Sequence, residues 1–163
     1  MFTRGFIPSL LVLLLTGCNV REPGAFETSV MTQIKRQLTV GGKSDKNPLP
    51  ATEANIRAGQ TNFAHYCDAC HGLDGQKTGV PFAEKMSPPV PSLTSAEVQA
   101  YRDGQLRSLI TNGIAPSGMP AAKGILDDDE IWSLVLYIRH LPDKGSLGEP
   151  RAYTEDTEAP PSR

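Results

Sequence analysis

The strongest helical pattern in the sequence lies near its C-terminal end, between residues 128 and 141. Asp127 and Glu130 form a capping-box-like pair at the start of this segment, and Pro142 stops it. The pattern predicts an amphipathic helix with one buried face. Its apolar stripe comprises Ile131, Leu134, Val135, Ile138 and Leu141.

Two further segments carry helical spacing. Thr52 is a plausible N-cap for a helix over residues 53–66, in which Ile56, Gly59, Phe63 and Tyr66 share a face. A second helical region over 95–111 is expected to break at Asp103-Gly104 and to end at Asn112-Gly113. Because no segment alternates as a strand does, the sequence predicts an all-α fold with long loops.

Composition changes this picture in two ways. The 163 residues include 15 Gly and 14 Pro, with prolines concentrated in 81–91, so much of the chain must be loop. Aromatic residues make up only 6%, so a small domain needs another group to fill its centre. The net charge of −2 excludes a nucleic-acid partner held by broad phosphate neutralisation.

The N-terminal segment is predicted to be a targeting signal rather than part of the fold. Arg4 precedes an apolar stretch over residues 6–15, which is too short to span a bilayer. The following Leu15-Thr16-Gly17-Cys18 resembles the bacterial lipoprotein processing signal, which implies cleavage before Cys18 and a lipid on its thiol. The alternative is an ordinary signal peptide followed by a chance cysteine.

The sequence thus divides into a lipoprotein signal peptide (1–17), a lipid-anchored tether (18–51), a compact domain (52–142) and a flexible C-terminal tail (143–163). Multiple acyl chains on Cys18 would suffice for stable membrane anchoring. The expected location is the periplasmic side of a bacterial membrane. Asn19, which follows the anchor, favours the outer membrane over the inner membrane as the location.

The run Cys67-Asp68-Ala69-Cys70-His71 carries the chemistry. Cys-x-x-Cys-His is the attachment signature of c-type haem: two thiols one turn apart bind two vinyl groups, and the following imidazole ligates the iron. A structural zinc site would need more ligands than the chain offers. A thioredoxin-like pair would need a preceding strand, and a simple disulfide leaves His71 unexplained. We expect one covalent haem c on Cys67 and Cys70.

The second axial ligand is expected to be Met119. It lies in Gly118-Met119-Pro120, where Gly and Pro can fix a loop that presents the side chain inward. Met86 is the runner-up, although it follows His71 closely in sequence. The other candidates considered are Met31, His65 and His140, and the ordinary role of a lone methionine is to fill a core gap.

From about Thr52 to Pro142 the sequence resembles a class I cytochrome c. The resemblance rests on Gly59 and Phe63, the Cys-x-x-Cys-His-Gly run, the Asn112-Gly113 and Met119 loop, and the closing helix. It implies that the first and last helices cross closely, with Gly59, Phe63 and Tyr137 at the contact. It also implies that a proline carbonyl binds the second nitrogen of His71, and Pro89 and Pro91 are both candidates.

His and Met ligands together close the iron to external molecules and raise its potential. The sequence therefore predicts a membrane-tethered electron carrier, or a fixed subunit of a respiratory or photosynthetic electron-transfer complex, with redox proteins as partners and no turnover of a substrate by itself. The alternative is a haem peroxidase or a gas or redox sensor with a displaceable sixth ligand. A scaffold lipoprotein with an incidental disulfide leaves the Met119 loop unexplained.

Overall fold

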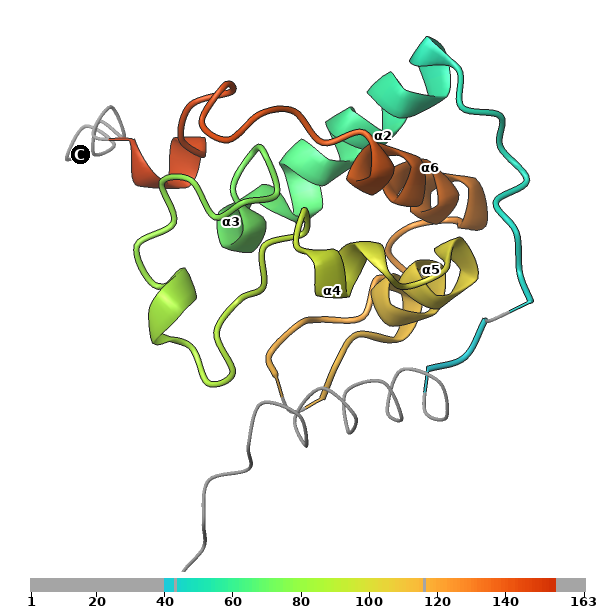
Figure 1. The fold of residues 1–163 in the computed structure, drawn as a ribbon, viewed down its shortest axis with the longest axis horizontal. Coiled ribbons are helices and arrows are strands. Elements are labelled where there is room, and N and C mark those ends of the chain that lie inside the picture. The colour runs from blue at the N-terminus through green and yellow to red at the C-terminus, as the bar shows by residue number, and fades with distance from the viewer. Residues whose placement is uncertain (1–39, 43, 116, 155–163) are drawn as a thin grey trace, which may run out of the picture.

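The computed structural model describes residues 40–42, 44–115 and 117–154. These residues form α2 (Glu53–Tyr66), α3 (Asp68–His71), α4 (Ala96–Gln99), α5 (Asp103–Asn112) and α6 (Asp128–Arg139). Two short 3₁₀ helices, η1 (Ala83–Lys85) and η2 (Arg151–Tyr153), complete the set (Figure 1). The described part of the chain contains isolated β-bridges and no strand, so the all-α expectation is confirmed.

The helix boundaries follow from local capping. The Thr52 side chain accepts a hydrogen bond from the Asn55 amide at the start of α2. At α6, Asp127 and Glu130 form a complete capping box, with both side chain–backbone bonds at 2.9 Å. The middle helical region consists of two helices, and the break between α4 and α5 falls at residues 100–102, slightly before the expected Asp103-Gly104.

The core is built on the packing of α2 against α6, which lie side by side in Figure 1. Gly59 makes this close approach possible, since a Cβ at that position would lie 2.0 Å from the Ser133 carbonyl oxygen. One turn later, the Phe63 and Tyr137 rings meet edge to face with centroids 5.2 Å apart. Residues 131–138 of α6 are all buried. The predicted crossing of the first and last helices is therefore present, with the three expected residues at the contact.

Replacing Gly59 by alanine is expected to destabilise the protein by about 3 kcal/mol, because the added Cβ must push α2 away from the backbone of α6. Denaturant unfolding of the holoprotein measures this loss. Ala58→Ser, on the exposed side of the same helix, is the control and should change stability by less than about 0.5 kcal/mol. Equal stability of Gly59→Ala and the wild type would contradict the close crossing.

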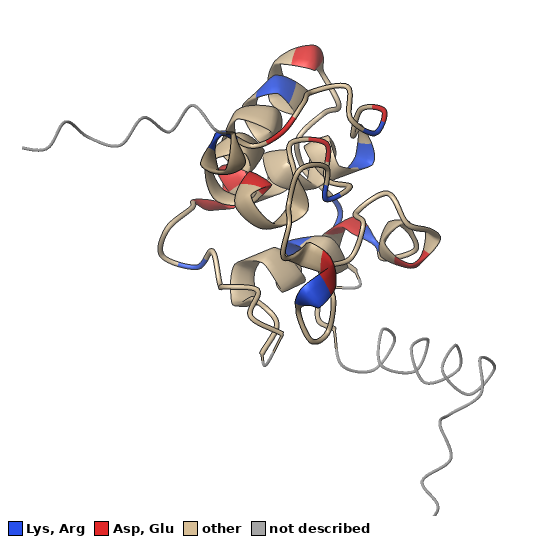
Figure 2. Ribbon diagram, turned by 90° about the vertical axis from the view of Figure 1, so that its left-hand side faces the viewer, with Lys and Arg blue, Asp and Glu red and all other residues tan. Residues whose placement is uncertain are grey.

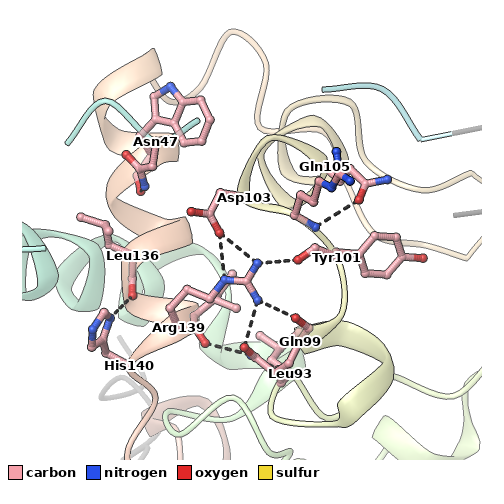
Figure 3. Close-up of polar contacts among 12 residues, drawn as sticks. Asn47, Leu93, Gln99, Tyr101, Asp103, Gln105, Leu136, Arg139 and His140 are labelled. Atoms are coloured by element: carbon pink, nitrogen blue, oxygen red, sulfur yellow. Dashed lines mark hydrogen bonds and ion pairs between the residues drawn. The ribbon is translucent and has the colours of Figure 1, made fainter. Parts of the chain in front are cut away.

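The end of α6 is joined to α4 and α5 by one guanidinium group, drawn in Figure 3. Arg139 Nε donates to Asp103 Oδ1 at 2.9 Å, and Nη1 donates to the Gln99 carbonyl and Oε1, each at 3.0 Å. Its Nη2 donates to the Tyr101 carbonyl. The planar fork of arginine suits such multiple bonding. Arg139 therefore fixes the α4–α5 connection against the core.

The N-terminal part of the described chain differs from a free tether. The Asn47 side chain donates to the Trp132 carbonyl at 3.0 Å, and Leu49 packs against the core. Gly42 lies so close to Gly104 that a Cβ would meet the Gly104 carbonyl oxygen at 2.0 Å. Residues 44–51 thus pack on the domain rather than only linking to it. The signal peptide, Cys18 and the rest of the predicted tether lie outside the described residues.

The segment after α6 also differs from the expected flexible tail. Residues 143–154 contain η2, and Pro150 is fully buried. Gly145 N donates to Asp74 Oδ2 at 2.7 Å, and Tyr153 Oη donates to the Ala69 carbonyl at 2.7 Å. The polar composition misled the prediction, because these contacts are hydrogen bonds and loop packing rather than an apolar stripe. The remainder of the predicted tail, 155–163, lies outside the described residues.

Basic and acidic residues are interspersed along the ribbon in Figure 2. Several belong to ion pairs, such as Lys77 with Glu84 and Arg107 with Asp128. Within the part of the chain that the structure describes, none of the helices has both the length and the apolar character needed to cross a bilayer.

Candidate haem site

The two cysteines of the attachment motif are placed by a short break between helices. Cys67 is both the C-cap of α2 and the N-cap of α3, and Cys70 lies within α3. Both are free thiols, so the disulfide alternative is not formed here. Burial, together with the nearby Asp68 and Cys70, raises the pKa of the Cys67 thiol to about 12. The motif therefore presents two free thiols one helical turn apart.

His71 ends α3 with its ring mostly enclosed. Its Nδ1 atom is buried and makes no hydrogen bond among the described residues. Burial lowers the pKa of His71, and the Pro91 backbone carbonyl partly offsets this by raising it, although the contact lacks full hydrogen-bond geometry. The neutral imidazole is the form that ligates a metal. Between the two candidate prolines, this contact favours Pro91.

The loop after His71 folds back on the motif. Lys77 N donates to the His71 carbonyl at 2.6 Å, and Tyr137 Oη donates to the Leu73 carbonyl at 3.2 Å. Asp74 is fully buried and accepts hydrogen bonds from Gln76 N and Thr78 Oγ1. Burial raises the pKa of Asp74, but the hydrogen bonds outweigh it, so that the net shift is downward. Asp74 is thus an ionised carboxylate that organises this loop.

Replacing Asp74 by asparagine is expected to cost about 2 kcal/mol of stability at pH 7, since the hydrogen bonds lose their charged acceptor. Because the folded pKa of Asp74 is lowered, its contribution is fully present above the ordinary carboxyl pKa and is lost as pH falls through the lower folded value. The stability gap between wild type and variant should therefore narrow below about pH 4. Urea unfolding of the holoprotein across pH measures it.

The control for this prediction is Asp143→Asn, which removes an exposed carboxylate from a neighbouring segment. It should leave stability within about 0.5 kcal/mol of the wild type at every pH. A gap between wild type and Asp74→Asn that widened toward acid pH would reverse the assigned direction of the pKa shift.

Met119 is carried by a tight loop after α5. Ile114 N donates to the Met119 carbonyl at 3.1 Å, which closes the loop. Gly113 has a φ of 67°, and a Cβ there would lie 2.6 Å from the Met119 carbonyl oxygen, so only glycine fits. The Met119 side chain is partly buried against the main apolar cluster, as Cys67 also is. The structure thus places the predicted axial methionine on the same core that supports the attachment motif.

The remaining ligand candidates lie elsewhere. His65 and His140 are exposed, and the Nδ1 of each contacts a backbone carbonyl one turn earlier on its own helix. Met86 packs in a second, smaller apolar cluster with Val80, Ala83 and Val90. The terminal methyl of Met86 nevertheless approaches the loop that carries Met119, since a Cβ on Gly118 would lie 3.3 Å from that methyl. Met31 lies outside the described residues.

These residues fit a covalently attached haem. The donor set is right: two free thiols, a neutral buried imidazole with one unbonded nitrogen beside a carbonyl, and a thioether on a separate loop. The two apolar clusters supply nonpolar side chains from the helices and from the loop after the motif. Sequence reasoning missed Asp74 and Tyr153. The bond from Gln76 N to Asp74 is an Asx-turn that the sequence could have suggested, but Tyr153 carries no such signal.

The fold and the site together define a c-type cytochrome, an electron-transfer protein with covalently bound haem c. A family model described as "Cytochrome C oxidase, cbb3-type, subunit III" matches residues 54–138, more than half of the sequence. The chain belongs to this family. The matched region contains the attachment motif, the Met119 loop and all but one residue of each crossing helix.

One solved structure that resembles the chain is the reducing HAO-like protein complex Kustc0457/Kustc0458 of Kuenenia stuttgartiensis. The sequences are 27% identical, the TM-score is 0.48, and the match covers 59% of this chain and 47% of that one. The chain therefore spans about half the length of that protein.

Proposed function

We propose that this cytochrome carries single electrons while tethered to the periplasmic side of a bacterial membrane, either between respiratory or photosynthetic complexes or as a subunit of one. The observation that carries the proposal is the pairing of one Cys-x-x-Cys-His motif with the Met119 loop on a shared core. The family description names an oxidase subunit, which favours the fixed-subunit form. Redox proteins are then its partners.

Bound haem supplies a reversible one-electron iron couple, and the protein determines its surroundings. Cys67 and Cys70 would hold the group covalently, and the His71 imidazole and the Met119 thioether would ligate its iron. The Pro91 carbonyl beside His71 would keep the ring oriented and its ligating nitrogen basic. The bond from Ile114 N to the Met119 carbonyl and the close packing of Gly113 shape the loop that carries Met119. A histidine and a methionine held on the protein in this way suit electron transfer with little rearrangement.

The surroundings of Met119 support a carrier rather than an enzyme. Its neighbours on the loop include Ile114, Ala115 and Ala121, none of which can donate a side-chain hydrogen bond or a proton. The nearby Ser117 hydroxyl donates to the Ile114 carbonyl at 2.6 Å. A peroxidase or gas sensor would need a polar group at this position. We therefore propose that the protein does not itself turn over a substrate.

Absorption spectra of the mature holoprotein test the closed site. We expect a weak long-wavelength iron–sulfur band in the ferric form and no change of the ferrous spectrum with carbon monoxide. A high-spin spectrum that shifts with carbon monoxide would instead establish an open iron and support the sensor or peroxidase alternative.

Membrane fractionation tests the tether independently. Full-length protein is expected in the membrane fraction and Cys18→Ser in the soluble periplasmic fraction, with identical haem content. A native gel of the detergent extract, stained for haem, then separates the two forms of the proposal: a band at high mass indicates a complex subunit, and one near the mass of the chain indicates a free carrier.

A further inference from the structure

The attachment helix α3 is too short to be stable alone. It has four residues, and an isolated helix of that length does not form in water. All of its carbonyls lack partners inside the helix and need them from outside. The Asp68 carbonyl accepts from Gly72 N at 2.8 Å, and the His71 carbonyl accepts from Lys77 N at 2.6 Å. Both partners come from the loop that follows.

Another carbonyl of α3, that of Ala69, accepts its hydrogen bond from a distant part of the chain. Ala69, which lies between the two attachment cysteines, accepts a hydrogen bond from Tyr153 Oη at 2.7 Å, across 84 residues of sequence. The Tyr153 ring packs edge to face on Phe82, with centroids 6.1 Å apart. It is the one residue after α6 that packs against the smaller apolar cluster in the described structure. Tyr153 therefore joins α3 to the loop that carries Phe82.

Tyr153 is held in place by the segment before it, residues 143–152. We call residues 143–154, which include Tyr153 and Thr154, the C-terminal clasp. Gly145 N donates to the buried Asp74 carboxylate. The Glu149 side chain covers Gly79, where a Cβ would meet Glu149 Cγ at 2.5 Å. Pro150 is fully buried. In Figure 1 the clasp returns from the end of α6 to the side of α3, beyond the region matched by the family model.

We propose that the C-terminal clasp fixes the attachment helix in its working orientation and that Tyr153 is the positioning residue through which it acts. Cys70 and His71 lie in this one turn of helix and Cys67 caps its start, so a rotation of α3 would move both attachment points and the proximal ligand together. The clasp limits that rotation by holding the Ala69 carbonyl. It also ties the turn to Asp74, which organises the loop behind His71.

Tyr153→Phe in the holoprotein tests the proposal, because it removes the hydroxyl and keeps the ring on Phe82. Hydrogen exchange at the His71 and Gly72 amides, which donate to the Cys67 and Asp68 carbonyls, should become about fivefold faster, as expected for local opening after loss of one hydrogen bond. Exchange at the Val135 amide in α6 should not change. The reduction potential should fall, because a loosened helix admits water and exposure stabilises the ferric state.

Tyr66→Phe is the matched control. Tyr66 directly precedes Cys67, and its hydroxyl makes no hydrogen bond within the described part of the chain. It should leave both exchange and potential unchanged. Deletion of the chain from residue 143 onward should accelerate exchange at the His71 and Gly72 amides more than Tyr153→Phe does. If the His71 and Gly72 amides of Tyr153→Phe exchanged at the wild-type rate, the proposal would be overturned. Equal acceleration of exchange at these amides and at the Val135 amide would also overturn it, because that result indicates only global destabilisation.

Discussion

Met119→Ala holoprotein is expected to keep its covalent haem, lose the ferric iron–sulfur band and bind carbon monoxide in the ferrous state. The reason is that Met119 is the proposed distal ligand, and alanine leaves that position without a donor. The reduction potential should fall by on the order of 0.1 V or more, since axial ligands set haem potentials over a range of about 0.8 V. Optical spectra and a redox titration measure both changes.

Met86→Ala is the matched control for this experiment. Met86 is also partly buried and approaches the distal loop at Gly118, but it packs in the smaller cluster. It should retain the iron–sulfur band and remain unreactive toward carbon monoxide. If Met119→Ala kept the potential and spectrum of the wild type, Met119 would not be a ligand. Loss of the band in Met86→Ala alone would assign the iron to Met86 instead.

Replacing both attachment cysteines, Cys67→Ser with Cys70→Ser, is expected to abolish covalent haem and most of the stable fold. The domain is small, and its apolar side chains form two separate clusters, so that little core remains without the haem. Denaturing gels stained for haem should show no signal, and circular dichroism should show a large loss of helix. Thermal unfolding should lose its cooperative transition.

The third cysteine supplies the control. Cys18→Ser should retain full haem staining and the helical spectrum of the wild type, because Cys18 lies outside the region 54–138 that the family model matches. Recovery of a stable, cooperatively folded double-serine variant would contradict the view that haem completes the core.

Much of the fold could be predicted because local rules determine it. The capping pair Asp127 and Glu130 and the Thr52 cap fix where α6 and α2 begin, and both depend on residues within one helical turn. The attachment motif is equally local. Gly59 could be placed at the helix crossing because the resemblance to class I cytochromes c implies that the first and last helices cross closely, which a small residue permits.

The rest depended on the path of the chain, which local patterns do not encode. The choice between Pro89 and Pro91 turned on how the loop passes His71. The packing of Asn47 on α6 and of Tyr153 on α3 joins residues more than 80 positions apart in sequence. Both contacts are made by single polar side chains in segments without periodicity, so the sequence predicted neither of them.

The packing of α2 against α6 has a consequence for how the chain folds. Asn62 and Ser133, which meet at this interface, are 71 positions apart, and the whole haem-binding segment lies between them. Closing a long loop costs entropy before the contacts that follow can compensate. Because folding slows as the contacts of the native state become less local, we expect the search for this long-range contact to limit the folding rate. The core therefore cannot assemble until α6 has been synthesised and can pack against α2. Until then the attachment motif lies in an unfolded stretch of chain that haem can reach.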